Sequence, residues 1–201
     1  MVVLALLSQT WIMGTESNWP NWRGKSENGS TSIGSYAAKF DNEKNVNWKT
    51  ELPAKGCSTP IVWKDQIIIT SPDGKKDTLV SFDWDGKKKW QTNVGSERAG
   101  KHRNGSGSNP SAITDGKLLF AYFKSGNLAG FTLDGKLLWK TNLQERFARD
   151  TLYWDIGTSP VLASKYVILA VMHSGESYLA AFNKRTGELA WKESRNYKTP
   201  V

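Results

Sequence analysis

The chain has 201 residues, with 27 Lys and Arg against 19 Asp and Glu, which gives a formal net charge of +8 at pH 7. The lysines are scattered and form no run longer than Lys87 to Lys89, so the sequence lacks the basic arm typical of nucleic-acid-binding proteins. Cys57 is the only cysteine, which excludes an intrachain disulfide and a cysteine-based zinc site. The chain also contains ten tryptophans, and recurrent aromatics are typical of radial β repeats.

Residues 1–18 are predicted to be a signal-peptide remnant or an N-terminal tail. The start, Met1 to Ser8, is apolar over too few residues to span a membrane. It resembles the apolar region of a secretory signal, although no Lys or Arg precedes it, and a buried strand is the alternative. The signal interpretation places the mature protein in the periplasm or outside the cell. Contact with a membrane is then expected only through the signal or an N-terminal anchor.

Three repeat units follow, and each contains four short runs that favour β-strands, separated by turn residues. A proline opens each unit, and a Gly-x-x-x-Trp phrase closes it. Four antiparallel strands in about 50 residues make one blade of a β-propeller. The sequence therefore predicts an all-β fold, an incomplete β-propeller with three four-stranded antiparallel blades. The prolines are Pro60, Pro110 and Pro160, and the phrases are Gly86 to Trp90, Gly135 to Trp139 and Gly187 to Trp191.

The propeller domain is expected to span residues 19–201. Within it, residues 45–52, which include Trp48, look like a fourth strand that would complete the last blade of a closed ring. Each recurring tryptophan is expected to pack between neighbouring sheets, and each recurring glycine to set a hairpin turn. The expected blades cover approximately residues 53–92, 105–141 and 156–193.

A helical solenoid is the competing class of repeat protein. It would need a 3.6-residue periodicity of apolar residues, which no segment shows. The best helical candidate, Asn142 to Thr151, is expected to be a polar loop.

The phrase Leu-x-x-Phe, followed by Gly-[Lys/Glu]-x-x-Trp-[Lys/Gln], resembles the repeat of the pyrroloquinoline-quinone-like, or quinoprotein-type, β-propellers. Trp19-Pro-Asn-Trp22-Arg-Gly24 resembles a segment that follows the signal peptide in exported members, many of them from planctomycete-type bacteria. The outer-membrane assembly lipoprotein BamB shares the repeat. The resemblance covers residues 48–191 and implies the propeller fold, whereas the superfamily includes dehydrogenases, assembly scaffolds and sensors.

Complete members of this superfamily contain about six to eight blades, and this sequence supplies three. An open arc of blades would leave strand edges exposed. We therefore expect the chain to be a fragment of a longer reading frame, or to find its missing blades in an assembly.

Two loops between successive blades, Asn93 to Gly107 and Asn142 to Gly157, are longer than the connections require. They are expected to converge on one rim as a cationic, aromatic-edged pocket for an anionic ligand or an acidic protein segment. The alternative is a pair of solvated loops whose charges pair with one another, such as Asp150 with Arg146 or Arg149. The candidate binding residues are Arg98, Lys101, His102, Arg103, Arg146, Arg149, Tyr153, Trp154 and Asp155.

Other candidate residues receive structural interpretations. The glycines of the first loop are expected to keep it flexible. His102 has no recognisable nucleophile partner, so no catalytic residue is assigned. His173 is expected at a surface or edge, and Cys57 is expected to be a small buried thiol.

The sequence favours a non-catalytic exported propeller that acts as a binding or assembly scaffold, with a protein or an anionic glycan as partner. The alternative is a fragment of a quinone-dependent alcohol or sugar dehydrogenase, and a sensor region of a larger protein is a third possibility. The resemblance implies that such dehydrogenases stack pyrroloquinoline quinone on a tryptophan, commonly use a disulfide between adjacent cysteines, and hold calcium with Glu, Asn and Asp. This chain has one cysteine and no matching calcium-binding constellation, so no cofactor-binding or metal-binding residue is assigned.

Overall fold

The computed structural model describes residues 18–32, 39, 41, 46–152, 154–173 and 175–195. The predicted signal remnant, apart from Asn18, lies outside the described residues, and so does Tyr153. No helix in the described part of the chain is long and apolar enough to cross a membrane.

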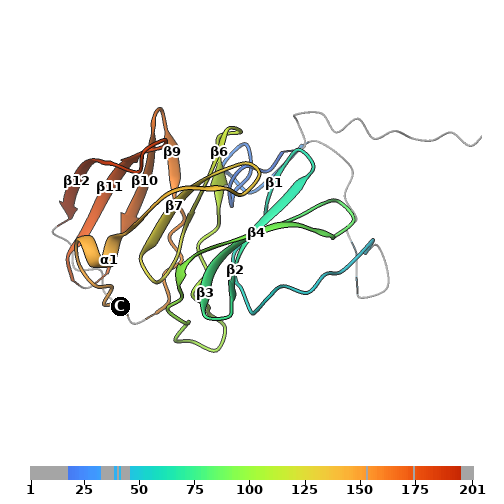
Figure 1. Ribbon diagram of the computed structural model, residues 1–201, viewed down its shortest axis with the longest axis horizontal. Helices are drawn as coiled ribbons and strands as arrows, with labels where there is room; N and C mark the ends of the chain where they lie inside the picture. The colour runs from blue at the N-terminus through green and yellow to red at the C-terminus, as the bar shows by residue number, and fades with distance from the viewer. Residues whose placement is uncertain are drawn as a thin grey trace, which may run out of the picture.

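The described strands form three separate four-stranded sheets, and each sheet is an antiparallel meander of consecutive strands. The sheets stand in sequence order, with the second between the other two (Figure 1). The first contains β1 (Ile61–Trp63), β2 (Gln66–Asp73), β3 (Lys76–Phe82) and β4 (Lys88–Ser96). The second contains β5 (Ile113–Thr114), β6 (Leu118–Tyr122), β7 (Asn127–Thr132) and β8 (Leu137–Asn142). The third contains β9 (Val161–Ala163), β10 (Tyr166–Val171), β11 (Ser177–Asn183) and β12 (Leu189–Arg195).

These sheets are blades of an incomplete β-propeller, which confirms the predicted fold class. The strands of the three sheets span residues 61–96, 113–142 and 161–195. The turns that join the first and second strands of the outer blades have a positive φ at Lys64 (57°) and at Ser164 (48°), as tight hairpins require.

The hydrophobic core lies between the blades rather than within one of them. Because successive side chains of a strand point to opposite faces, β6 supplies residues to two clusters. Leu119 and Ala121 pack with residues of the first blade, whereas Phe120 and Tyr122 pack with residues of the third. The second blade is therefore buried on both faces and joins its neighbours into one body.

The recurring tryptophans face very small residues in their own blade. In each third strand a β-bulge shifts the register just before the recurring phenylalanine. The shift places each tryptophan opposite a residue whose side chain leaves room for the indole. At Gly130 a Cβ atom would lie 2.5 Å from Cε2 of Trp139. The pairs are Ser81 with Trp90, Gly130 with Trp139, and Ala181 with Trp191.

Each tryptophan of the first two blades also contacts the hairpin glycine of the following blade. Gly187, in the β11–β12 turn, has a φ of 72°, and a Cβ atom on it would lie 2.5 Å from Cδ2 of Trp139. Trp90 lies against Gly135 in the same way, and the φ of Gly135 is 85°. Only glycine combines this backbone conformation with the absence of a side chain. The glycine therefore forms the hairpin, as predicted, and also receives the tryptophan of the preceding repeat.

The N-terminal segment provides the matching contact for the first blade. Trp48 lies against Gly86, and its Nε1 donates a hydrogen bond to the carbonyl oxygen of Trp84 (2.5 Å). Residues 46–52 form no strand, so their pairing with a last blade stays a prediction. Further upstream, Trp19 forms an isolated antiparallel bridge with Val62 of β1.

Candidate functional site

The two long inter-blade loops lie against each other, and Asp155 joins them. Its carboxylate accepts hydrogen bonds from the backbone N–H of Lys101 (2.8 and 3.0 Å) and of His102 (3.1 Å) in the other loop. It also forms an ion pair with Lys124, whose side chain is fully buried in the β6–β7 turn. The Lys124 Nζ donates a second hydrogen bond to the carbonyl oxygen of Ala99 (2.8 Å). One carboxylate thus holds three segments of chain together.

The same contacts keep the Asp155 carboxylate charged. Burial alone would raise the pKa of this group, but the hydrogen bonds from Lys124, Lys101 and His102 outweigh burial. The pKa of Asp155 therefore lies below its usual value. A charged carboxylate is what the buried Lys124 ammonium group requires, because an unpaired buried charge is strongly destabilising.

Several of the predicted rim cations are occupied by contacts between the loops. Arg98 forms an ion pair with the buried Asp150 (3.5 Å) and donates a hydrogen bond to Gln144 Oε1 (3.0 Å). Lys101 Nζ donates to the carbonyl oxygen of Leu152 (2.5 Å). Asp150 thus pairs with a cation of the opposite loop.

The glycines of the first loop serve close packing. A Cβ atom on Gly105 would collide with the Asp155 carboxylate, and one on Gly100 would lie 2.7 Å from the backbone of Gly105. The expectation of a loop kept flexible by glycine therefore needs correction. These residues allow the chain to fold back closely on itself and to receive Asp155.

The remaining candidates lie on the outer side of this joined structure. Trp154 is 53% exposed, and its ring makes an edge-on contact with the ring of His102, with centroids 5.7 Å apart. Arg103 and Arg149 are exposed, and the Arg146 guanidinium lies over the ring of Phe147 at 5.4 Å. The loops therefore have an aromatic and cationic outer surface. The hydrogen bonds and ion pairs of Asp155 and Asp150 hold the backbone beneath it.

The second loop also contains a single helical turn where a loop without helix was expected. Helix α1 (Leu143–Arg146) begins after Asn142, whose side-chain oxygen accepts hydrogen bonds from the N–H groups of Gln144 (3.0 Å) and Glu145 (3.1 Å). This N-cap, together with the buried Leu143, stabilises the turn.

Two single-residue expectations are wrong. His173 lies at the start of the β10–β11 connection and is 1% exposed. Its Nδ1 accepts a hydrogen bond from the N–H of Gly175 (3.0 Å). Cys57 is exposed rather than buried, and its Sγ contacts the carbonyl oxygen of Asn104 at 2.9 Å.

Asp77 is a buried carboxyl group that the sequence did not indicate. It lies at the junction of the first two blades, where its Oδ2 accepts hydrogen bonds from Asn127 Nδ2 (2.7 Å) and from the Ser125 hydroxyl. Its Oδ1 is buried and accepts no hydrogen bond from the described residues. Burial raises the pKa of Asp77 to about 6, against the hydrogen bonds from Ser125 and Asn127 and with a smaller contribution from Glu97.

Asp77→Asn is expected to remove a pH-dependent part of the stability. The carboxyl has a pKa of about 6 in the folded chain and 3.8 as its ordinary value. The native state therefore binds the extra proton between these values, and the free energy of unfolding falls as the pH rises through this window, by roughly 2–3 kcal/mol. Asparagine stays neutral and can still accept both hydrogen bonds, so the variant should be the more stable protein at pH 7. Urea unfolding at about pH 4.5 and pH 7 measures this slope, and an unchanged slope in the variant would assign it to another group.

The described residues contain no group of three or more His, Cys, Asp or Glu side chains that could hold a metal ion. The single cysteine also excludes the adjacent-cysteine disulfide that the resemblance implies.

Consecutive antiparallel sheets whose tryptophans pack on the hairpin glycine of the next sheet define a β-propeller of the quinoprotein type. The family model described as "Outer membrane protein assembly factor BamB" matches residues 31–201, so the chain belongs to that family. This match confirms the resemblance seen in the repeat. A search among curated proteins finds no match.

The structure is also similar to several solved structures. One is the quinohemoprotein alcohol dehydrogenase from Comamonas testosteroni, with a TM-score of 0.60 and 15% identity over 88% of this chain and 27% of that one. Another is a quinohemoprotein alcohol dehydrogenase from Pseudomonas putida HK5, with a TM-score of 0.54 and 19% identity over 73% and 22%. BamB from Moraxella catarrhalis gives 0.51 and 21% identity over 75% and 42%. At these identities the likeness shows the fold alone, and this chain spans less than half of each of these structures.

Proposed function

We propose that this chain forms part of a non-catalytic, exported β-propeller that serves as a binding or assembly scaffold. The joined inter-blade loops are its partner surface, and an acidic segment of another protein is the partner. Membership of a family described as an outer membrane protein assembly factor supports export.

The observation that carries this proposal is the exposure of Trp154 next to an anchored residue. Asp155, the next residue, is fixed by Lys124 and by two backbone N–H groups. An exposed tryptophan on a fixed backbone loses little entropy on binding, and tryptophan and arginine are enriched among the residues that dominate interface energies. The exposed Arg103 lies next to His102, the ring that contacts Trp154, and supplies positive charge for an acidic partner.

The double substitution Trp154→Ala and Arg103→Glu is expected to weaken binding of a ten-residue glutamate peptide by about tenfold or more. Arg98 and Lys101 are left intact because they hold the loops together. Lys87→Glu, an exposed site in the β3–β4 turn with the same charge change, is the matched control and should bind as wild type. Equal affinity of wild type and double variant would remove the loop surface as the site. Preference of the wild type for a heparin oligosaccharide would assign the surface to an anionic glycan.

The dehydrogenase alternative has its own test. Purified protein is mixed with pyrroloquinoline quinone, calcium and an alcohol, and reduction of an electron-accepting dye is followed. We expect no reduction above the level without protein. Dye reduction that depends on this chain would overturn the non-catalytic proposal, whatever the outcome of the peptide titration.

A further inference from the structure

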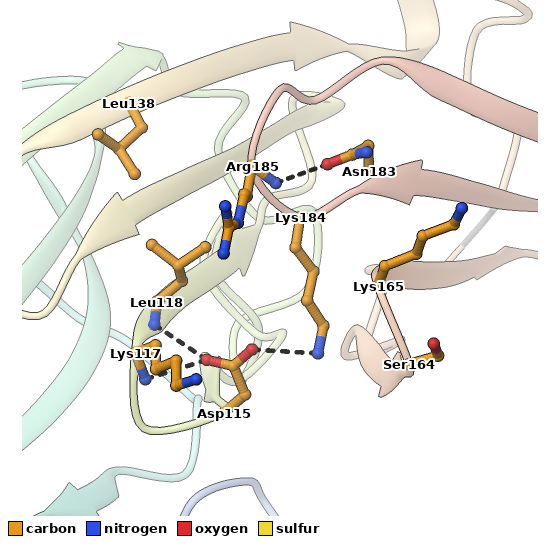
Figure 2. Close-up of a pocket in the computed structure, with 9 residues that line it drawn as sticks. All are labelled: Asp115, Lys117, Leu118, Leu138, Ser164, Lys165, Asn183, Lys184 and Arg185. Carbon is orange, nitrogen blue, oxygen red and sulfur yellow. Dashed lines mark hydrogen bonds and ion pairs between the residues drawn. The ribbon is translucent and has the colours of Figure 1, made fainter.

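A groove of about 880 Å³ lies between the second and third blades (Figure 2). The strand order places it at the end of the sheets opposite the joined loops. In an antiparallel meander, the turns between strands one and two and between strands three and four share one end. The loops that lead to the next blade leave from the other end. The groove is lined by the β5–β6, β9–β10 and β11–β12 turns and by β8. It is therefore separate from the surface described above.

Lys184 fixes the walls of this groove. Its backbone N–H donates to the carbonyl oxygen of Lys165 (3.0 Å), and its carbonyl oxygen accepts a hydrogen bond from Trp139 Nε1 (2.8 Å). Its Nζ forms an ion pair with Asp115 across the groove (3.1 Å), as Figure 2 shows. One residue therefore ties together two turns of the third blade and two elements of the second, so that the groove is formed before any ligand binds.

Asp115 is fully engaged in this structure and does not neutralise the other cations. Its carboxylate accepts hydrogen bonds from the N–H groups of Lys117 and Leu118 (3.0 Å each) as well as from Lys184. Burial alone would raise the pKa of Asp115, but these contacts outweigh burial and hold the pKa below its usual value. The carboxylate is thus a permanent part of the wall.

Three further cations line the groove: Lys117, Lys165 and Arg185. Their side chains form no ion pair with any acidic group in the described ranges. Leu138, which is 43% exposed, and Leu118 form an apolar floor at one end, close to Arg185, whereas Lys165 lies at the other end (Figure 2). The apolar patch therefore has Arg185 beside it, and Lys165 lies beyond Arg185 at the far end of the groove (Figure 2).

The corresponding junction between the first and second blades differs at the decisive positions. Each of these two blades has a β-bulge just before the tryptophan of its fourth strand. The extra residue at the bulge is Leu138 in β8 and Lys89 in β4. Lys89 forms an ion pair with Asp65 (2.5 Å), so this junction has a neutralised cation where the groove has an apolar side chain. An exposed leucine at this position is thus a feature of the second junction and not of the repeat.

We propose that this groove binds an acidic peptide segment of a partner protein, in which a large apolar side chain stands beside carboxylates. The apolar side chain packs on Leu118 and Leu138. One carboxylate pairs with Arg185 and Lys117, and another pairs with Lys165. An extended segment fits better than a small ligand, because the groove is open to solvent along its length and small ligands usually bury most of their surface.

The test is a calorimetric titration of the full chain with the peptide acetyl-EELEE-amide and with the same peptide carrying serine in place of leucine. Wild type should bind the leucine peptide about tenfold more tightly than the serine peptide. The double substitution Arg185→Glu and Lys165→Glu should weaken binding of the leucine peptide by about tenfold or more. Leu138→Ser should remove most of the preference for leucine. The control with the same change in charge, Lys87→Glu with Lys88→Glu at two exposed positions, should leave both titrations unchanged.

Four outcomes would overturn the proposal. Equal affinity for the two peptides would reduce the groove to a general electrostatic surface, and inorganic phosphate that binds as tightly as the leucine peptide would show a simple anion site. Unchanged binding in the Arg185 and Lys165 variant would place the peptide elsewhere. The variant with Trp154→Ala and Arg103→Glu serves in the same titration. If it alone loses the leucine peptide, the loop surface is the site and the groove is not.

Discussion

Trp139→Ala is expected to lower the free energy of unfolding by about 3–5 kcal/mol. The indole lies between two blades, against Gly130 of its own sheet and Gly187 of the next. Its Nε1 also donates the hydrogen bond to Lys184 that fixes one wall of the groove. Truncation would leave a cavity at the junction, because Gly130 and Gly187, which lie against the indole, have no side chains that could fill the space. Urea unfolding followed by circular dichroism measures the loss.

Trp191→Ala is the matched control for this prediction. Trp191 holds the same place in its blade, opposite the small Ala181, but it is 37% exposed and no glycine hairpin of the described chain covers it. Its truncation should cost clearly less than that of Trp139. Equal losses in the two variants would show that packing within a blade, and not the contact with the following glycine, accounts for the effect.

Asp155→Ala should produce the second large effect, a loss of about 3–5 kcal/mol in the free energy of unfolding. The substitution leaves the Lys124 ammonium group buried without its counter-charge. It also removes the acceptor for the backbone N–H groups of Lys101 and His102, so the first loop should become susceptible to proteolysis. Chemical denaturation and limited trypsin digestion measure the two consequences.

A second substitution shows whether the buried charge is the cause. Lys124→Met in the Asp155→Ala background should recover part of the stability, because it removes the unpaired ammonium group. Asp65→Ala provides the exposed counterpart, since it breaks an ion pair with Lys89 in which the carboxylate is 68% exposed. That change should cost less than about 1 kcal/mol. A large loss in Asp65→Ala, or no recovery in the double variant, would contradict this account.

The repeated part of the fold could be predicted from the sequence because its cause is local and recurs. Each Gly-x-x-x-Trp phrase sets a hairpin, and the regular spacing of the prolines indicates one sheet per unit. The partner of each tryptophan was harder to predict. Gly135 and Trp139 belong to the same phrase in the sequence, but they do not contact each other as partners. In the structure, Trp90 packs on Gly135, and Trp139 packs on Gly187. Only the packing of one blade on the next reveals this exchange.

The candidate site was predictable in outline only. Loop length and charge indicated the two loops, and the structure brings them together through Asp155. Lys124 gave no signal, because it is a single lysine in a short turn and its burial depends on a loop that follows about thirty residues later. The groove gave no signal for the same reason. Its cations come from three turns, and their proximity results from the packing of the blades.

The contact between each tryptophan and the following glycine gives the array a polarity. Each blade has a tryptophan on the side that faces the following blade and a hairpin glycine on the side that faces the preceding blade. Two blades can therefore pack together in one order only. A duplication that begins after one tryptophan and ends after the next would add a complete module and restore every junction without new complementary mutations. Duplication between these points would let propellers of this family change their number of blades by recombination. In this chain, residues 91–139 form a unit that could be duplicated or exchanged in protein engineering.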